Sequence, residues 1–472
     1  MHVSASVAVP LWLLVGLAFL SGWAILDRLL RPAARAVLRR RANRLIEELN
    51  ARLPLRLPPF KTAKREALVD QLRFDPRVLE AAEAYARETG QTREAVQKRV
   101  ARDAREIVPA FSAWFYFRAG TATARALARS LFRVRLGAAD DTGLRAIPEG
   151  STVVFVMNHR SNMDYILLSY LAAEKTALSY AVGEWARIWP IQGLVRATGA
   201  YFVRRDSKDP LYRRLLERWV AMATANGVPQ ALYPEGGLSR DGALRPPKLG
   251  LLDYMLRGFD PKGPRDLVFV PVGVNYDRVL EDRTLLLDRS PAQGRASLSD
   301  TLGGTLSFLL RNARLLVANE WHRFGYACVS FGSPVSTRAW LAARGLDPAS
   351  VSREARFAAV EELARDLMAR IARVIPVLPV SLVASALADS PARAWSELEL
   401  KSEIFARWRA LEAGGAYVHV PRGDQDYAVS VGLRMLTLRR LVRAEGGLFR
   451  PVAQELPLLR YYANAIALAP RA

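Results

Sequence analysis

The sequence is poor in the residues that bind metals or form cross-links. Its 472 residues include a single cysteine, Cys328, and four histidines, His2, His159, His322 and His419. One cysteine excludes an internal disulfide and a cluster of thiolates around a metal, and it is consistent with a reducing compartment. Four dispersed histidines also disfavour a histidine-rich metal centre. We therefore expect a protein without a resident metal ion.

Acidic residues are scarce relative to basic ones. The chain has 68 Lys and Arg against 46 Asp and Glu, which gives a formal net charge of +22 at pH 7. This excess favours anionic partners such as a bilayer surface, nucleic acid, or phosphorylated and acidic substrates. No helix-turn-helix pattern, zinc-ligand spacing or RNA-recognition signature accompanies the charge, so no nucleic acid partner is expected. A membrane-anchored nucleic-acid-binding protein stays open as the alternative from another functional class.

Charged residues are missing altogether from residues 7–26, an apolar run long enough to cross a hydrocarbon core of ~30 Å as a helix. Arginine is frequent in residues 28–44, whereas residues 1–6 contain no Lys or Arg, which predicts that the C-terminal side is cytoplasmic. A cleaved signal peptide is one alternative, disfavoured because the run lacks a basic n-region. A helix lying flat on the membrane is another, disfavoured because the run has no polar face.

The rest of the chain divides into three regions by the periodicity of its apolar residues. Helical periodicity with capping residues, Asp75 before Pro76 at one helix start and Gly90 at its end, indicates a helical bundle. Short apolar strands then alternate with helices, which predicts an α/β domain. Helical periodicity returns afterwards, with a loop or hairpin expected at residues 417–430. The predicted order is a transmembrane helix, a basic helical region, the α/β domain and a mainly helical C-terminal region, at residues 7–26, 27–136, 137–335 and 336–472.

One stretch of the α/β region combines a histidine with a carboxylate. Residues 151–157 are apolar and β-branched, which predicts a buried strand, and a polar stretch follows before an apolar helix begins at Tyr165. Chemistry in open α/β sheets is found at the carboxyl ends of strands. Four residues separate His159 from Asp164, so the carboxylate can fold back and orient the imidazole as a general base. A helix-capping cluster is the simpler alternative for the same polar residues.

Three further strands of this region end in polar or unusual residues. Arg204 and Arg205 end one apolar run, Glu235 lies in a Pro-Glu-Gly-Gly turn after another, and Pro271 interrupts a third, buried strand. Each has a structural alternative, respectively a solvated strand end, a helix cap or ion pair, and a core strand. In combination they can bind phosphate, because guanidinium groups fork onto it and Ser239 with glycine N–H groups can complete a cradle.

These four stretches, in this order, resemble the four motif blocks of the glycerolipid acyltransferase family, which transfers fatty acyl groups to glycerol phosphates. The first contains the family's pattern of a histidine, four residues and an aspartate. The longer sequence HRSNMDYILLSY from His159, a Pro-Lys pair after the third block, and segments at residues 377–387 and 458–466 are most like the glycerol-3-phosphate acyltransferase branch. Blocks one to four lie at residues 158–165, 199–205, 233–240 and 270–277.

The resemblance implies an O-acyltransferase that needs no cofactor. Such an enzyme moves an acyl group from acyl-CoA or acyl carrier protein to the sn-1 hydroxyl of glycerol 3-phosphate, giving 1-acylglycerol 3-phosphate for phospholipid synthesis. Acylation of 1-acylglycerol 3-phosphate at sn-2 is the alternative. The resemblance also implies an α/β domain with a mixed sheet flanked by helices, in a bacterial membrane protein that contacts membrane lipid. Together with the apolar run and the arginines after it, this predicts a location in the bacterial cytoplasmic (inner) membrane, with the catalytic domain on the cytoplasmic side.

Roles for individual residues follow from the same resemblance. His159 is the expected base, Asp164 its partner, and backbone N–H groups near residues 158–161 are candidate donors to the oxyanion. Leu238 departs from the branch, which often has an arginine there, and removes one phosphate contact. The expected ligands of glycerol phosphate are Arg204, Arg205, Glu235, Gly236, Ser239, Arg240 and Lys248, and the expected lining of the acyl channel is Val270, Pro271 and Val272.

Overall fold

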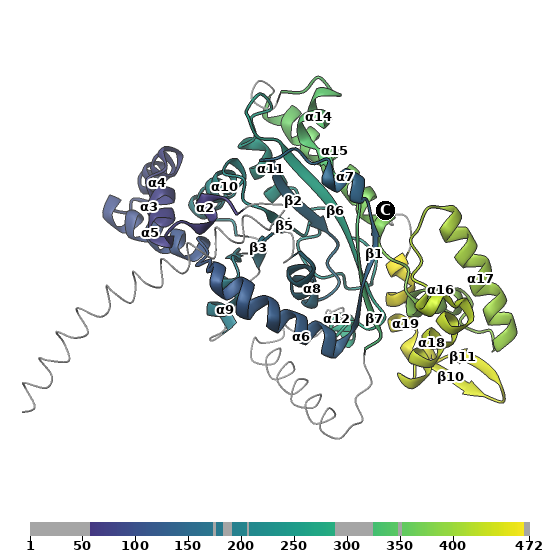
Figure 1. Ribbon diagram of the computed structural model, residues 1–472. Coiled ribbons are helices and arrows are strands. Elements are labelled where there is room, and N and C mark those ends of the chain that lie inside the picture. Colours follow the sequence, from purple (N-terminus) through teal and green to yellow (C-terminus); the bar gives the residue numbers. More distant parts are fainter. Residues whose placement is uncertain are drawn as a thin grey trace, which may run out of the picture. The chain divides into compact units, whose positions relative to one another are not determined.

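The protein was analysed as a computed structural model (Figure 1). The expected membrane helix at residues 7–26 and the adjoining residues 27–56 lie outside the part of the chain that it describes. Within that part, no helix is both long and apolar enough to cross a bilayer. Contacts group the chain from Leu57 onward into one compact unit. The described residues are 57–172, 176–182, 191–204, 207–287, 324–347 and 352–466.

An eight-stranded sheet lies at the centre of this unit (Figure 1). Its strands are β1 (Arg133–Ala139), β2 (Thr152–Met157), β3 (Ser179–Val182), β4 (Tyr201–Phe202), β5 (Gln230–Leu232), β6 (Leu267–Tyr276), β7 (Tyr326–Phe331) and β8 (Val335–Ser336). They are ordered β1-β7-β6-β2-β5-β3-β4, and β8 pairs with β6. Strand β2 runs parallel to both of its neighbours, whereas β6 is antiparallel to β7 and β8. The sheet is therefore mixed, as the sequence predicted.

Helices flank this sheet in two groups. Helix α11 (Gly250–Arg257) packs on both α10 (Pro210–Ala225) and α15 (Arg353–Val374), and α15 also contacts β2 and β6. Helices α6 (Thr121–Leu131) and α8 (Met163–Ala172) pack on each other (Figure 1). The predicted architecture of a mixed sheet flanked by helices is confirmed. The shorter helices of this region are η1 (Phe115–Gly120), α7 (Asp141–Arg145), α9 (Ile191–Ala197), α12 (Asp282–Leu287) and α14 (Thr337–Ala342).

A group of helices precedes the sheet and follows the predicted caps. The Asp75 side chain accepts a hydrogen bond at the start of one helix, Gly90 ends that helix with a left-handed φ of 67°, and Thr92 caps the next. Helix α10 contacts three of these helices, so they pack directly on the α/β region. They are α2 (Pro59–Thr62), α3 (Arg65–Arg73), α4 (Pro76–Thr89) and α5 (Arg93–Ile107).

The C-terminal region is mainly helical and carries a small antiparallel sheet. The loop expected at residues 417–430 ends early, because Asp424 accepts the Tyr427 N–H and starts a helix at Gln425. The hairpin lies further on, where Gly446 and Gly447 both adopt the positive φ that a tight turn requires. The elements are α16 (Pro379–Asp389), β9 (Trp395–Ser396), α17 (Glu397–Ala413), η3 (Pro421–Gly423), α18 (Gln425–Leu438), β10 (Val442–Glu445), β11 (Leu448–Pro451), η4 (Ala453–Glu455), α19 (Leu456–Ala463) and η5 (Asn464–Ile466).

Strand β6 corrects one further expectation, because Pro271 does not interrupt it. The strand runs through the proline as ten consecutive buried residues. On its antiparallel side, β8 pairs as far as Phe269 and β7 pairs from Val272 onward, so Pro271 lies between the two ladders. Its missing N–H therefore removes no ladder hydrogen bond, and its carbonyl accepts from Gly332.

Candidate active site

The polar ends of several strands meet at one edge of the sheet. Strands β2 and β5 are parallel, so blocks one and three follow them at the same edge. A cleft of about 440 Å³ opens there. It is lined by His159 from block one, Tyr233 and Gly236 from block three, Lys248 just after it, and Arg204 from block two.

His159 and Asp164 form the buried pair that the sequence predicted. The Nδ1 atom of His159 lies 2.9 Å from Oδ2 of Asp164, and the two side chains are 2% and 0% exposed. The same Oδ2 accepts the backbone N–H groups of Arg160 and Ser161, and Oδ1 accepts the Tyr276 hydroxyl at 2.6 Å. An ionised carboxylate only accepts hydrogen bonds, so it selects the tautomer with Nδ1–H and leaves Nε2 of His159 able to take a proton.

Glu235 connects block one to block three. Its Oε1 accepts the backbone N–H of His159 at 2.8 Å and its Oε2 accepts that of Arg245 at 3.0 Å. Burial raises the pKa of Glu235 to about 7, although these two hydrogen bonds and the nearby guanidinium of Arg160 oppose the rise. Ser239 adds a second link, because its N–H donates to the carbonyl of His159. Glu235 thus holds the loop after β2 in place from inside the protein.

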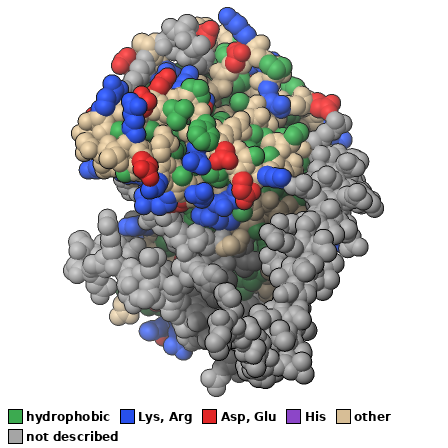
Figure 2. Space-filling view, turned by 90° about the vertical axis from the view of Figure 1, so that its left-hand side faces the viewer, with side chains coloured by type: hydrophobic (Ala, Val, Ile, Leu, Met, Phe, Trp, Pro, Cys, Tyr) green, Lys and Arg blue, Asp and Glu red, His purple; other side chains and the backbone are tan. Residues whose placement is uncertain are grey.

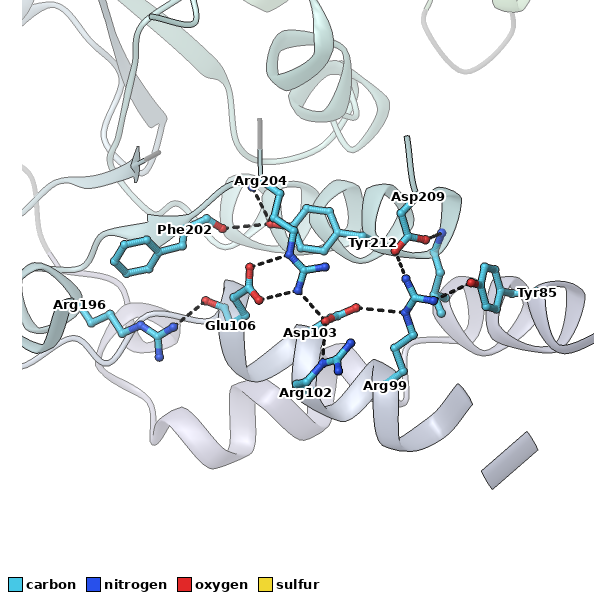
Figure 3. Close-up of polar contacts among 11 residues, drawn as sticks. Tyr85, Arg99, Arg102, Asp103, Glu106, Arg196, Phe202, Arg204, Asp209 and Tyr212 are labelled. Carbon is cyan, nitrogen blue, oxygen red and sulfur yellow. Dashed lines mark hydrogen bonds and ion pairs between the residues drawn. The ribbon is translucent and has the colours of Figure 1, made fainter. Parts of the chain in front are cut away.

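Arg204 is held by carboxylates of the protein (Figure 3). Its Nε and Nη2 donate to the two oxygens of Glu106 at 3.0 and 2.6 Å, and Nη2 also donates to Asp103 at 2.9 Å. Both acids lie on α5, three residues apart and therefore on one face of that helix. Arg99, from the same helix, continues the network to Asp209 at the start of α10. The guanidinium expected to bind phosphate therefore already uses two of its three nitrogens within the protein.

The other predicted ligands of glycerol phosphate are dispersed. Lys248 and Gly236 line the cleft together, and a Cβ at Gly236 would lie 2.6 Å from the Lys248 side chain, so the glycine permits this contact. Ser239 is buried and donates its hydroxyl to the carbonyl of Ala243. Arg240 is exposed and is not among the residues that line the cleft. Arg205 lies outside the described residues.

The three residues expected to line an acyl channel lie in the middle of β6. Val270, Pro271 and Val272 are buried and pair with residues 155–157 of β2. None of them is among the residues that line the cleft. The apolar wall of the cleft comes instead from other elements, including Val182, Val203, Leu216, Leu232, Leu251 and Phe357.

Tyr233 is a cleft residue that the sequence did not single out. Its ring lies 4.1 Å from the His159 ring, centroid to centroid, at an interplanar angle of 35°. Its hydroxyl is buried and has no hydrogen-bond partner within the described part of the chain. Its place immediately before the Pro-Glu-Gly-Gly turn, at the end of β5, was the available signal. A buried hydroxyl without a partner beside the base is suited to meet a substrate atom.

The C-terminal region supports the same loops. The Tyr461 ring of α19 lies 4.5 Å from the Arg160 guanidinium, and the Tyr461 hydroxyl donates to the Arg160 carbonyl. Arg160 in turn donates to the carbonyl of Gly242 at 2.6 Å, and the Asn464 side chain donates to the carbonyl of Asp241. The segment at residues 458–466 therefore packs against block one and the loop that follows block three.

A metal site is not evident in this region. Among the described residues, no group of three or more His, Cys, Asp or Glu side chains is placed to hold an ion.

Comparisons with known proteins match both halves of this arrangement. Residues 139–275 match the family model described as Acyltransferase. Residues 307–468 match the model of the glycerol-3-phosphate acyltransferase C-terminal region. The described fold and the His159–Asp164 cleft thus lie in a chain that contains an acyltransferase domain, which confirms the resemblance read from the four blocks.

The chain is also similar to curated proteins that are named glycerol-3-phosphate acyltransferases. A glycerol-3-phosphate acyltransferase of Ectopseudomonas mendocina (strain ymp) is 31% identical over 338 residues, which cover 69% of this chain and 39% of the relative. The glycerol-3-phosphate acyltransferase of Xanthomonas axonopodis pv. citri (strain 306) is 31% identical over 270 residues, which cover 55% of this chain and 29% of the relative. The 1-acyl-sn-glycerophosphate acyltransferase PlsC of Thermotoga maritima, a solved structure, is 17% identical with a TM-score of 0.30, covering 64% of this chain and 96% of that one. The chain matches the glycerol-3-phosphate acyltransferase branch over less than half the length of those curated relatives.

Proposed function

We propose that the protein transfers a fatty acyl group from an acyl thioester to the sn-1 hydroxyl of glycerol 3-phosphate. The observation that carries this proposal is the buried His159–Asp164 pair, of which His159 lines a cleft with an apolar wall and basic side chains. The named relatives and the match to the C-terminal region of their family support the choice of acceptor. Acyl-CoA and acyl carrier protein are both suitable donors.

The chemistry requires one base and no covalent enzyme intermediate. In our proposal Nε2 of His159 takes the proton of the acceptor hydroxyl as that oxygen attacks the thioester carbonyl. The tetrahedral intermediate then expels the thiolate, which receives the proton back from the imidazolium. Asp164 stabilises the imidazolium and keeps the ring oriented through both steps.

Three of the four backbone N–H groups that the sequence suggested as donors to the developing oxyanion are already hydrogen-bonded within the protein. The backbone N–H of His159 donates to Glu235, and those of Arg160 and Ser161 donate to Asp164. These groups are therefore already used. The Tyr233 hydroxyl, buried next to the imidazole and without a partner in the described residues, is the donor we propose instead.

Glycerol phosphate is proposed to bind at the basic end of the cleft. Lys248 and Arg213 both line it, from the segment after block three and from α10. Arg204 and Arg257 also line it, and both form ion pairs with carboxylates of the protein. We assign the phosphate to Lys248, which lies against Gly236 of block three, and to Arg213, and we give Arg204 a positioning role because Asp103 and Glu106 hold its guanidinium.

We also propose that residues 7–26 anchor the enzyme in a bacterial inner membrane, with the cleft on the cytoplasmic side. The apolar run and the arginines after it support this orientation. Protease protection of an N-terminal tag in inverted membrane vesicles tests it. A tag digested without detergent would place the N-terminus on the cytoplasmic side and refute the proposal.

The decisive experiment is acyl transfer by the purified full chain in detergent. Radiolabelled palmitoyl-CoA and a palmitoyl carrier protein are offered separately with glycerol 3-phosphate or with 1-acylglycerol 3-phosphate, and His159→Ala is the control. We expect 1-acylglycerol 3-phosphate to form from glycerol 3-phosphate. Product from the lysolipid alone would move the enzyme to the sn-2 step, and product from neither acceptor would refute the proposed acyl transfer to glycerol phosphates.

A further inference from the structure

A second hollow, of about 450 Å³, lies between the sheet edge and the C-terminal region. It is lined by Arg133 and Arg135 of β1, Tyr326 of β7, and the consecutive residues His419, Val420, Pro421 and Arg422. Three arginines and a histidine thus face one space, and no carboxylate is among the described residues that line it. We propose that this hollow, called here the edge site, binds a phosphate-bearing anion. The proposal does not depend on the reaction proposed above.

The sheet side of the edge site presents two fixed cations. Arg133 and Arg135 are two residues apart on one strand, so their side chains leave the same face of the sheet. Their guanidinium groups lie 5.7 and 5.8 Å from the centroid of the Tyr326 ring. Arg133 Nη1 also donates to the Tyr326 hydroxyl at 3.5 Å, and Arg135 Nη1 donates to the carbonyl of Val134 at 3.1 Å. Contact with the aromatic face helps to hold each guanidinium in place, and a guanidinium has five N–H groups, so others can donate to an anion.

The C-terminal side adds a third cation and an unused imidazole nitrogen. Arg422 has a φ of 60°, a left-handed conformation that is costly for a residue with a Cβ. Its guanidinium lies 4.2 Å from the centroid of the Tyr427 ring. His419 is 8% exposed and packs on Tyr326, and its Nε2 is buried without a hydrogen-bond partner in the described part of the chain. A phosphate oxygen would supply the partner that this nitrogen lacks.

Among the described residues, no carboxylate lines the edge site to neutralise its charge. Asp277 interacts electrostatically with Arg133. Burial raises the pKa of Asp277, and the positive charge of Arg133 partly opposes that rise. It is fully buried, and its two oxygens accept the backbone N–H groups of Tyr326 and Val380. By contrast, basic and acidic side chains are intermixed on the face bearing α3, α4 and α5 (Figure 2). The edge site is therefore a local concentration of positive charge.

A neighbouring hollow extends this charge along the sheet edge. It has a volume of about 380 Å³ and shares Arg133 and Arg135 with the edge site, and it adds Arg129 and Tyr170. The Arg129 guanidinium lies 5.7 Å from the centroid of the Tyr170 ring. Because arginine forks bidentately onto phosphate oxygens, a phosphomonoester or a phosphodiester suits this set. The ligand can come from a lipid headgroup or from a soluble phosphate.

The test is ligand binding by the purified full chain in a neutral detergent at constant ionic strength. The two probes are inorganic phosphate and soluble dihexanoyl phosphatidylglycerol, measured by calorimetry. The test variant carries Arg135→Gln and Arg422→Gln. The matched control carries Arg409→Gln and Arg434→Gln, which remove the same charge from exposed positions on α17 and α18.

We expect wild type and control to bind alike and the test variant to lose about tenfold in affinity for at least one probe. Loss confined to the lipid identifies a headgroup site, and loss confined to inorganic phosphate identifies a soluble ligand. Equal affinities in all three proteins, or loss in the control as well, would overturn the proposal.

A second variant separates binding from folding. Arg422→Gly removes the third cation and also relieves the left-handed backbone, so its melting temperature without ligand should not fall. It should nevertheless bind the same probe more weakly than wild type does. Unchanged affinity in this stable variant would show that Arg422 contributes nothing to anion binding and would contradict the proposed edge site.

Discussion

The two polar walls of the cleft are held in different ways. His159 is oriented by Asp164 and Glu235, which belong to the same α/β region and leave its Nε2 available for chemistry. Arg204 is oriented by Asp103 and Glu106 from α5, a helix that precedes this region, and these contacts use its Nε and Nη2. The wall that bears His159, which we propose to be catalytic, is thus organised within the acyltransferase domain, whereas the opposite wall, which bears Arg204, depends on the N-terminal helices.

The largest effect should come from the catalytic wall. His159→Ala removes the base and should lower the rate of acyl transfer by about 10²- to 10⁴-fold. Its melting temperature, measured in parallel, checks that the fold persists. An Asp164→Asn variant should also be slow, because the amide can favour the wrong imidazole tautomer. Near-normal turnover by folded His159→Ala protein would remove the basis of the mechanism.

The opposite wall should respond mainly in stability. Arg204→Ala leaves Asp103, which is fully buried, without its closest cation and should cost about 3 kcal/mol in unfolding free energy. Urea unfolding measures the loss. A double-mutant cycle with Glu106→Gln should show coupling of about 1–3 kcal/mol between the two side chains.

Substrate kinetics distinguish positioning by Arg204 from direct phosphate binding. If Arg204 acts by positioning the wall, Lys248→Gln should raise the KM for glycerol 3-phosphate more than Arg204→Lys does. If Arg204→Lys instead raises this KM more than Lys248→Gln does, and Arg204→Ala is as stable as wild type, the phosphate is assigned to Arg204. Both walls would then contact substrate directly.

Substitution of Tyr233, on the catalytic wall, should change activity without reducing stability. Its hydroxyl has no partner in the described residues, so Tyr233→Phe should leave the melting temperature unchanged or raise it slightly. The loss of one hydrogen bond to the transition state should lower kcat by about fivefold. Tyr212→Phe is a matched control, because the Tyr212 hydroxyl is already bonded to the backbone of Phe202 and Arg204. Equal kcat values for Tyr233→Phe and wild type would exclude the proposed donor.

The smallest effect concerns the pH dependence of stability. The folded-state pKa of Glu235 is raised to about 7 from an ordinary value of 4.5, so its contribution is full below 4.5 and is lost as pH rises through about 7. The melting temperature of wild type should therefore fall between about pH 5 and about pH 8, and fall less in Glu235→Gln. Asp277, whose pKa is also raised to about 7, keeps part of the slope in that variant. Parallel profiles would show that Glu235 is ionised throughout.

The sequence predicted local features well because they depend on neighbouring residues. Asp75 and Gly90 bound a helix as expected, and the spacing of His159 and Asp164 was sufficient to predict their contact. Both cases depend on short-range geometry, in which a cap or a turn is specified by a few residues. The α/β class followed from the alternation of strands and helices, whereas the mixed sheet was implied by the family resemblance and joins segments far apart in the sequence.

Contacts between distant segments could not be read from the sequence. Arg204 is separated by 98 residues from Glu106, and a motif alone does not show that its arginine is already paired. Pro271 was expected to interrupt its strand, and this was wrong. The proline is tolerated because it lies between the ladders that β7 and β8 form with β6, and the sequence around Pro271 does not show how these two later strands pair. The orphan hydroxyl of Tyr233 likewise becomes visible only when all its neighbours are placed.

The contact of Tyr461 with Arg160 spans 301 residues and has a consequence for biosynthesis. A Cβ at Gly242 would come within 1.8 Å of the Tyr461 carbonyl, so the loop after block three is closely packed against a segment that is made much later. During translation the catalytic loop must wait for this segment to leave the ribosome before it can gain all its native contacts. Until then the loop is exposed to chaperones. A chain that stops before α19 lacks the contacts of Tyr461 with this loop.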